Sequence, residues 1–233
     1  MPNAAELRVG GLTRLSSCDW PGELVATLFC QGCPWACRYC HNPHLIPGGE
    51  PGAVPWADVT AFLRTRRGLL DGVVFSGGEP TVQGRLVDAV QAVRELGFRV
   101  GLHTAGPSPD RLEALLPFLD WIGFDVKAPF GSYPRITGVP GSGSRARDSL
   151  ERALASGVAL EVRTTVHPAL LDGAALSELA DELLTLGIRR YALQPFRKLG
   201  CGDAALLAAP ALPAMDTLSM IAARFPDGTV RPS

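Results

Sequence analysis

Several features that define other classes of protein are missing from this 233-residue sequence. No stretch approaches the run of about 18 apolar residues that a membrane span requires, and residues 1–17 hold no apolar run typical of an export signal. The formal net charge is only −1, which predicts no general attraction to nucleic acid or to an anionic membrane. We therefore expect a cytoplasmic protein with no nucleic-acid or membrane partner.

Lysine is nearly absent as well, because Lys127 and Lys198 are the only lysines among 22 basic residues. Internal repeats and low-complexity tracts are also lacking, which argues against a solenoid or a long linker. With 46% hydrophobic and 19% charged residues, the chain can bury a substantial core. Its length favours a single domain over residues 1–233.

Cysteine is sparse but concentrated, since four of the six cysteines lie in the segment 30–43, called here the cysteine loop. Cys33, Cys37 and Cys40 form a C-x3-C-x2-C array. A 4Fe–4S cube held only by protein uses four thiolates, so three leave one iron open to a substrate or cofactor. In a cytoplasmic chain, cysteines indicate ligands or free thiols rather than disulfides. The spacing therefore predicts an iron–sulfur site.

Three other interpretations explain less of the cysteine loop. Two zinc knuckles, Cys30/Cys33 and Cys37/Cys40, would be separated by three residues, whereas zinc ribbons place about 15–20 between them. The run from Cys37 to His41 matches a c-type haem attachment pattern, but such haem belongs outside the cytoplasm. A thioredoxin-like dithiol leaves most of the cysteines unused.

Strand-like apolar runs alternate with helical patterns along the chain. This alternation predicts an α/β protein with a parallel sheet and right-handed crossovers, either doubly wound or closed into a partial barrel. Residues 129–144, rich in Gly, Pro and Ser, are expected to form a loop. The expected strands are 24–29, 72–75, 99–103, 121–126, 160–166 and 190–196, and the expected helices are 56–70, 86–96, 108–118, 145–156, 175–186 and 215–225.

Unusual polar residues follow the carboxyl ends of these strands. In such folds, side chains at this rim form the active site, and a random scatter would not place them all there. Besides the cysteine loop after the first strand, they are Gly77, Gly78 and Glu79 after the second, His103 at the third, Asp125 and Lys127 at the fourth, Arg163 in the fifth and Arg197 after the sixth.

At this point the cysteine loop resembles the signature of the radical S-adenosylmethionine enzymes. Flanking segments, Asp-Trp-Pro-Gly-Glu at 19–23 and Tyr-Cys-His-Asn-Pro at 39–43, are similar to those of the glycyl-radical-enzyme activases, most closely the activases of anaerobic ribonucleoside-triphosphate reductase. Cys30 stands where those relatives often have Phe, and we interpret it as a small buried residue. The resemblance implies a six-stranded partial (β/α)6 barrel of the radical S-adenosylmethionine type.

The resemblance also implies a set of cofactor contacts. Cys33, Cys37 and Cys40 would hold a 4Fe–4S cluster, and the backbone edge of the Gly77-Gly78-Glu79 turn would bind the amino group of S-adenosylmethionine. Glycines suit such a turn because a side chain would block close backbone approach. The remaining implied contacts are Tyr39 and His41 from the cysteine loop, Asp125 and Lys127 over the methionine end, Arg163 at the carboxylate and Arg197 near the adenosine.

Several of these residues also have simpler interpretations. The Gly-Gly-Glu-Pro run could be an ordinary turn, Asp125 and Lys127 a surface pair, and Tyr39 a core aromatic. Arg163 needs an anion if buried, and Glu161 would serve as well as a cofactor carboxylate. His103 stands where pyruvate formate-lyase activase has an Asp that helps to hold a monovalent cation; since His is a poor ligand for such an ion, no cation site is predicted.

The activity implied by the resemblance is reductive cleavage of S-adenosylmethionine and removal of a hydrogen atom from a backbone glycine of a partner enzyme. The expected partner is a glycyl-radical enzyme, namely anaerobic ribonucleotide reductase, with a flavodoxin- or ferredoxin-like electron donor. Two alternatives stay open: a small-substrate radical enzyme such as a 7-carboxy-7-deazaguanine synthase, and a non-enzymatic protein that binds an iron–sulfur cluster or zinc.

Overall fold

One eight-stranded sheet organises the computed structural model, which describes residues 4–49, 52–211 and 213–231. The strands stand in chain order; β1 runs antiparallel to β2, and every later pair of neighbours is parallel. The predicted domain 1–233 therefore includes eight residues, 1–3, 50–51, 212 and 232–233, that lie outside the described ranges. The strands are β1 Val9–Ser16, β2 Val25–Cys30, β3 Gly72–Gly77, β4 Arg99–Thr104, β5 Trp121–Asp125, β6 Ala159–Val166, β7 Arg190–Pro195 and β8 Asp227–Val230.

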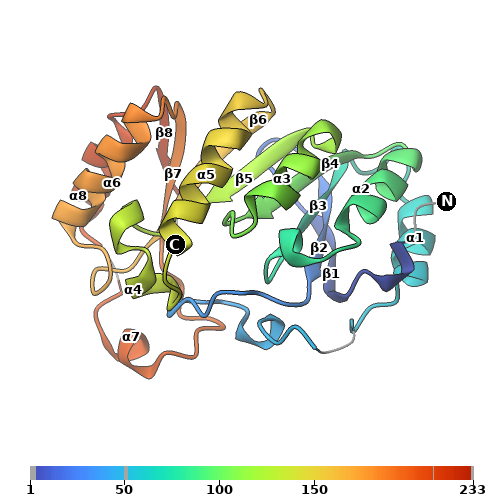
Figure 1. Cartoon of the computed structure of the whole chain (residues 1–233), viewed down its shortest axis with the longest axis horizontal. Coiled ribbons are helices and arrows are strands. Elements are labelled where there is room, and N and C mark those ends of the chain that lie inside the picture. Colours follow the sequence, from blue (N-terminus) through green and yellow to red (C-terminus); the bar gives the residue numbers. More distant parts are fainter. Residues whose placement is uncertain (1–3, 50–51, 212, 232–233) are drawn as a thin grey trace.

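Helices connect the parallel strands and follow one another from α1 to α8 along the sheet (Figure 1). The cysteine loop runs along the lower edge in this view, on the same side as α4 and α7 (Figure 1). The helices are α1 Trp56–Arg64, α2 Leu86–Glu95, α3 Pro109–Leu115, α4 Pro134–Thr137, α5 Ser142–Ala155, α6 Gly173–Thr185, α7 Ala204–Ala208 and α8 Met215–Ala222.

The predicted parallel α/β sheet is confirmed, and each of the six expected strands is present, from β2 to β7. Within the described ranges β1 and β8 each pair with a single neighbour, so the sheet stays open, as in a partial barrel. Sequence patterns missed both edge strands because their side chains are mostly half-buried or exposed and carry no apolar run.

The prediction of a loop over residues 129–144 is wrong. This segment contains a 3-10 turn at Phe130–Ser132, the short helix α4 and the start of α5. Its Gly and Pro residues bound these elements: Pro134 opens α4, and Gly138 ends it in the left-handed region with φ of 72°.

The two faces of the sheet differ in character. One face packs against the helices through residues such as Val73, Phe75 and Ile122, all fully buried. On the opposite face Val25, Val74 and Trp121 form a separate cluster with Trp20, whose ring stacks on that of Trp121 with 5.5 Å between centroids. Since these residues lie in the first half of their strands, they close the amino-terminal end and leave the carboxyl end for polar side chains.

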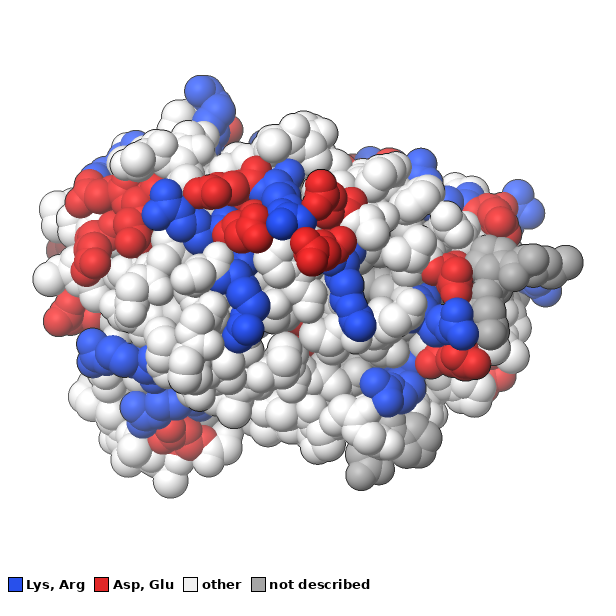
Figure 2. Space-filling model, in the orientation of Figure 1, with Lys and Arg blue, Asp and Glu red and all other residues white. Residues whose placement is uncertain are grey.

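The surface carries charges of both signs. Over the α3–α5–α6 side, acidic and basic groups are interleaved (Figure 2), and Arg152 bridges Asp110, Glu113 and Asp148 there. Among the described residues, no helix is long and apolar enough to cross a membrane.

Candidate active site

The cysteine loop leaves the end of β2 and is anchored by backbone hydrogen bonds on two sides. The amide of Gly32 donates to the carbonyl of Leu45 at 2.7 Å. Further along, the amides of Ala36 and Arg38 donate to the carbonyls of Thr137 and Ile136, at 3.1 and 3.2 Å. The short helix α4, missing from the sequence prediction, is therefore the support on which the loop rests.

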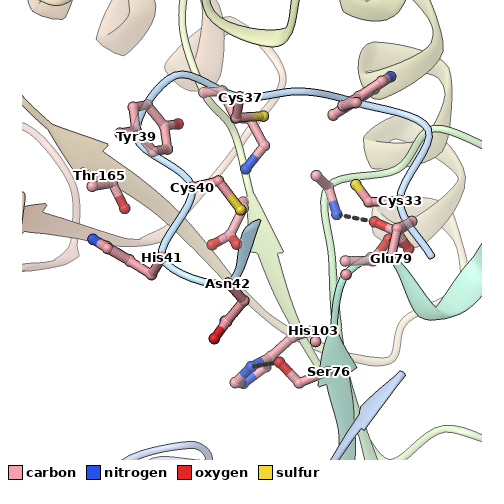
Figure 3. A pocket seen from close by; sticks show the side chains of 17 residues that line it. Cys33, Cys37, Tyr39, Cys40, His41, Asn42, Ser76, Glu79, His103 and Thr165 are labelled. Carbon is pink, nitrogen blue, oxygen red and sulfur yellow. Dashed lines mark hydrogen bonds between the residues drawn. The ribbon is translucent and has the colours of Figure 1, made fainter. Parts of the chain in front are cut away.

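The thiols of Cys33, Cys37 and Cys40 line one cavity of about 150 Å³ at the carboxyl end of the sheet, and Figure 3 shows them around its open space. All the predicted site residues except Arg163 and Arg197 line this cavity, called here the cysteine cavity. They are Cys33, Cys37, Tyr39, Cys40 and His41 from the loop, Gly77, Gly78 and Glu79 from the end of β3, and Asp125 and Lys127 from the end of β5.

The donor set fits an iron–sulfur cluster, because thiolates are its usual ligands and a cube takes each thiolate on a different iron. Among the described residues, no three His, Cys, Asp or Glu side chains are placed to hold a single metal ion. Burial raises the pKa of the Cys33 thiol to about 12, and burial also raises that of Cys37 although Lys127 opposes the shift. The free thiols of Cys33 and Cys37 are therefore protonated at neutral pH, and iron binding there would release protons.

Gly77 and Gly78 lie against the backbone of the cysteine loop and do not face open space. A Cβ on Gly77 would lie 2.4 Å from the backbone nitrogen of Cys30, and one on Gly78 would lie 2.4 Å from the carbonyl oxygen of Gly32. Gly77 also has φ of +109°, which side chains rarely adopt. The structure shows that the two glycines admit the backbone of the loop, and their contact with a cofactor stays a prediction.

Glu79 is 2% exposed, and its carboxylate links the ends of β3 and β4. One oxygen accepts from the hydroxyls of Thr81 and Thr104, both at 2.7 Å, and from the amide of Thr81 at 3.1 Å. The other accepts from the amide of Ala105 at 2.9 Å. Burial raises the pKa of Glu79, and these hydrogen bonds oppose the rise. The side chain therefore holds the rim of the cavity in shape.

Lys127 lies over the ring of Tyr39, with 5.6 Å between its ammonium nitrogen and the ring centroid. Burial works to lower the pKa of Lys127, but Tyr39, Cys37 and Asp125 raise it well above its usual value. The backbone amide of Lys127 donates to the hydroxyl of Tyr133 at 3.0 Å. A half-buried cation thus lines the cavity beside the cysteines, which argues against the simpler interpretation of Asp125 and Lys127 as a surface pair.

His41 is fixed by the segment that follows β7. Its ring nitrogen Nε2 lies 2.9 Å from the backbone oxygen of Arg197 and its ring stacks on Phe196, with 5.6 Å between centroids. Burial lowers the pKa of His41, and the charges of Arg197 and Lys127 add to this effect. The imidazole is therefore neutral at pH 7, and Nε2 donates its proton to the carbonyl.

Arg163 and Arg197 line an adjoining cavity of about 510 Å³, which shares His41, His103 and Asp125 with the cysteine cavity. Arg163 is 5% exposed, and its Nε donates to Glu161 at 2.7 Å. Its guanidinium lies over the ring of Trp121, toward the closed end of the sheet. Glu161, which the sequence analysis gave as an alternative partner of Arg163, therefore pairs with it.

Several residues at the cavities were missed by the sequence analysis. Trp35, Asn42, Ser76 and Thr165 line the cysteine cavity. The sequence offered a signal for Ser76 and Thr165. Side chains alternate along a strand, so each of these residues, at a strand end, points to the same face as the inward side chain two positions before it. Trp35 and Asn42 carry no such signal, since loop side chains follow no period.

Two glutamines, also missed, fasten the loop to the rest of the chain. The side-chain amide nitrogen of Gln31 donates to the backbone carbonyls of His44 and Pro47, at 3.1 and 2.9 Å. The side-chain amide nitrogen of Gln83 donates to the backbone carbonyls of Arg8 and Gln31, at 2.8 and 3.1 Å. Gln83 therefore ties the start of the loop to Arg8, the residue that precedes β1.

Comparison with known proteins identifies the family to which the chain is similar. The family profile described as Radical SAM superfamily matches residues 27–192. A glycyl-radical enzyme activating enzyme of Methanocaldococcus jannaschii is 28% identical over 198 residues, covering 81% of this chain and 79% of the relative. The pyruvate formate-lyase-activating enzyme of Clostridium pasteurianum is 28% identical over 204 residues, covering 83% of both. A 7-carboxy-7-deazaguanine synthase of Methanopyrus kandleri is 30% identical but covers only 46% of this chain and 51% of the relative.

Solved structures share the fold at low sequence identity. Streptococcus suis SuiB bound to precursor peptide SuiA has a TM-score of 0.65 at 14% identity, covering 87% of this chain. The chain spans about half of that structure, 47% of its length. Escherichia coli QueE has a TM-score of 0.58 at 18% identity, covering 97% of this chain and 94% of QueE.

Proposed function

The chain belongs to the Radical SAM superfamily and uses a 4Fe–4S cluster and S-adenosylmethionine, and we propose that it is an activase that places a glycyl radical on a partner enzyme. The observation that carries the proposal is the convergence of Cys33, Cys37 and Cys40 on one cavity beside the Gly77–Glu79 turn. Two relatives that match over about four fifths of both chains, each named as an activating enzyme, support the choice of activase.

In this proposal the three cysteines hold the cluster through their thiolates. The backbone edge of Gly77, Gly78 and Glu79, fixed by the Glu79 carboxylate, binds the amino group of S-adenosylmethionine. When bound, the cluster and S-adenosylmethionine supply the electron and the adenosyl radical that removes a hydrogen atom. The other proposed cofactor contacts are Asp125 and Lys127 at the methionine end, the loop residues Tyr39 and His41, and Arg163 and Arg197 from the adjoining cavity.

Lys127 and Arg163 would contribute differently. Lys127 already lines the cysteine cavity as a half-buried cation, which suits an anionic group of the cofactor. Arg163 holds Glu161 through Nε, and its Nη2, which has no partner, would be the donor to a cofactor carboxylate. Glu161 also pairs with Arg231, so it does not depend on Arg163 alone.

We place the partner's glycine loop in the adjoining cavity, because this cavity is larger than the cysteine cavity and shares its walls. Anaerobic ribonucleotide reductase is the proposed partner, on the strength of the segments 19–23 and 39–43. A flavodoxin- or ferredoxin-like protein would supply the electron. All six cysteines are free thiols, which agrees with the proposed cytoplasmic location.

The experiment is to reconstitute the protein without oxygen, add S-adenosylmethionine and a chemical reductant, and then add a candidate partner. Anaerobic ribonucleotide reductase should develop the paramagnetic signal of a glycyl radical, and pyruvate formate-lyase is the matched comparison. A signal only on pyruvate formate-lyase would refute the proposed partner but keep the activase. Cleavage of S-adenosylmethionine without a radical on either enzyme would favour a small-substrate enzyme, such as a 7-carboxy-7-deazaguanine synthase.

A further inference from the structure

Leu199 projects almost wholly into water beside the cysteine loop. The residue is 88% exposed, the highest value among the exposed large hydrophobic residues that the structure describes. Single exposed leucines are common on protein surfaces and need no special role. The meaning of this one therefore depends on what holds it in place and on the charges around it.

Residues 197–201, called here the basic turn, carry this leucine and are fastened to the cysteine loop. Besides the hydrogen bond of His41 described above, the thiol of Cys201 donates to the backbone carbonyl of Arg38 at 3.6 Å. Gly200 lies against the backbone of the loop, since a Cβ at this glycine would be 2.1 Å from the carbonyl oxygen of His41. The exposed leucine therefore stands on a turn that the cysteine loop holds in place.

The two contact points lie on either side of a proposed cluster ligand. Arg38 precedes Cys40 by two residues and His41 follows it directly, so the basic turn touches the backbone on both sides of this cysteine. Gly200, which touches His41, is also the neighbour of Leu199 in the chain. A path of few residues therefore joins the exposed leucine to the ligand.

The surroundings of the basic turn are positively charged. The segments 30–46, 128–141 and 194–209, which are joined by hydrogen bonds, contain four Lys or Arg residues and one acid, Asp203, which pairs with Arg38 at 2.8 Å. This region carries a net charge of +3 in a chain whose formal net charge is −1. In Figure 2 basic atoms gather at the lower left, the end at which Figure 1 draws α7. The four cations, all exposed, are Arg38, Arg135, Arg197 and Lys198.

We propose that the basic turn, with Leu199 at its apex, is the docking surface for an acidic protein that supplies the electron. This rests on the proposed function, in which the carrier loses one electron and the cluster gains it. Electron transfer slows steeply with distance, so a carrier must bind close to a ligand such as Cys40. An acidic rim on the carrier would be steered by the four cations, and an apolar edge beside its redox group would cover the leucine. Electron-transfer complexes bury little surface, so one apolar contact surrounded by charge suits such a partner.

The first test measures the dissociation constants of an acidic flavodoxin and an acidic ferredoxin for the reconstituted protein by calorimetry. Lys198→Glu and Leu199→Asp should each weaken binding of the carrier about tenfold, and added salt should weaken binding to wild type. The matched controls are Arg67→Glu and Leu69→Asp, an exposed pair just before the amino-terminal end of β3, away from the cysteine loop. Wild-type affinity in both test variants, or failure of wild type to bind either carrier, would overturn the inference.

The second test compares two reductants on the same variants, with rapid mixing and the cluster absorbance as the readout. Reduction by the carrier should be about tenfold slower in Lys198→Glu and Leu199→Asp, whereas reduction by photoreduced deazaflavin, a small molecule, should keep its rate. Slower reduction by both reductants would show that the turn supports the cluster site, and would refute the docking surface.

A third readout separates the electron carrier from the partner enzyme. With deazaflavin as the reductant, both test variants should still place a glycyl radical on the partner at the wild-type rate. Loss of the radical under these conditions would show that the partner enzyme docks on the basic turn, and would overturn the inference. Failure of wild type to assemble any cluster would refute the proposed function, whereas the binding test, which needs no turnover, would still decide the docking surface.

Discussion

The amide of Gly78 donates a hydrogen bond to the carbonyl of Cys30 at 2.9 Å, and this contact joins the end of β3 to the start of the cysteine loop. The neighbouring amide of Glu79 donates to Gly32 at 2.8 Å. These bonds exist because nothing larger than hydrogen stands between the two backbones. The position of the cysteines therefore depends on glycines of another strand.

Replacing Gly78 by Ala should destabilise the protein by about 1–3 kcal/mol and reduce cluster loading, because the new Cβ would meet the carbonyl of Gly32. Chemical unfolding and iron content measure the two effects. The matched control is Gly84→Ala, at a position with open space around it, which should change stability by less than about 0.5 kcal/mol. Equal stability of both variants would contradict the proposed close approach.

Replacing any one of Cys33, Cys37 or Cys40 by Ala should abolish the cluster absorbance and all cleavage of S-adenosylmethionine, because a cube with two protein ligands is poorly held. The other cysteines are the controls: Cys18 is exposed, and Cys30 and Cys201 are buried outside the cavity lining. Loss of the cluster in Cys30→Ala, with retention in Cys33→Ala, would show that the ligands are assigned wrongly.

Glu79→Gln should lower the free energy of unfolding by about 2–3 kcal/mol, because the new amide NH2 would face a donor that the carboxylate now accepts. Urea unfolding at pH 7 gives the number. Glu95→Gln at the exposed end of α2 is the matched control and should be neutral. A neutral effect at Glu79 would mean that the rim does not need this carboxylate.

Lys127→Met should keep the cluster but weaken binding of S-adenosylmethionine about tenfold to a hundredfold, since a charge-assisted contact is worth roughly 1.5–3 kcal/mol. The change in the paramagnetic signal of the cluster on adding S-adenosylmethionine measures the affinity. Arg145→Ala, on the exposed side of α5, should bind as wild type does. Wild-type affinity in Lys127→Met would remove Lys127 from the proposed site.

Arg163→Ala distinguishes the two roles open to that residue. If Arg163 binds the cofactor carboxylate, affinity for S-adenosylmethionine should fall as it does for Lys127→Met. If it serves only Glu161, the affinity should stay unchanged and the variant should lose stability, by less than the roughly 3–5 kcal/mol of a buried charge left unpaired, because Arg231 still pairs with Glu161. Measuring both quantities on the same preparation decides between them.

Stability should fall on acidification partly because of His103. Burial, with the nearby charge of Arg163, lowers the pKa of His103 to about 4, whereas the unfolded value is about 6.5. Between these values the unfolded chain binds the proton and the folded chain does not, so stability decreases as pH falls from about 6.5 to about 4. The full effect is on the order of 3 kcal/mol.

His103→Gln should flatten that part of the pH profile of unfolding free energy. His44→Gln is the control, because His44 is exposed and its removal should leave the profile unchanged. The same slope in wild type and His103→Gln would show that another group causes the loss. His103 also makes hydrogen bonds to Ser76 and to the carbonyl of Asp19. Because the His103→Gln variant loses these contacts, it should be less stable than wild type at neutral pH.

The sequence by itself determined the chemistry and the sheet. The C-x3-C-x2-C spacing is local, so it identified the iron–sulfur ligands proposed here without reference to the fold. Strand and helix periodicity is local too, and it predicted β2 to β7 and the rim to which their ends bring Glu79, Asp125 and Lys127. Hydrophobic patterns suffice for these features because buried parallel strands are apolar on both faces.

Only the tertiary structure decided what depends on contacts between distant segments. It showed that Gly77 and Gly78 make room for the cysteine loop, that Arg163 turns toward Glu161, and that α4 supports the loop. It also exposed the unsatisfied indole of Trp35. None of these features leaves a periodic pattern in the sequence. Each depends on a contact between two segments that only the fold brings together.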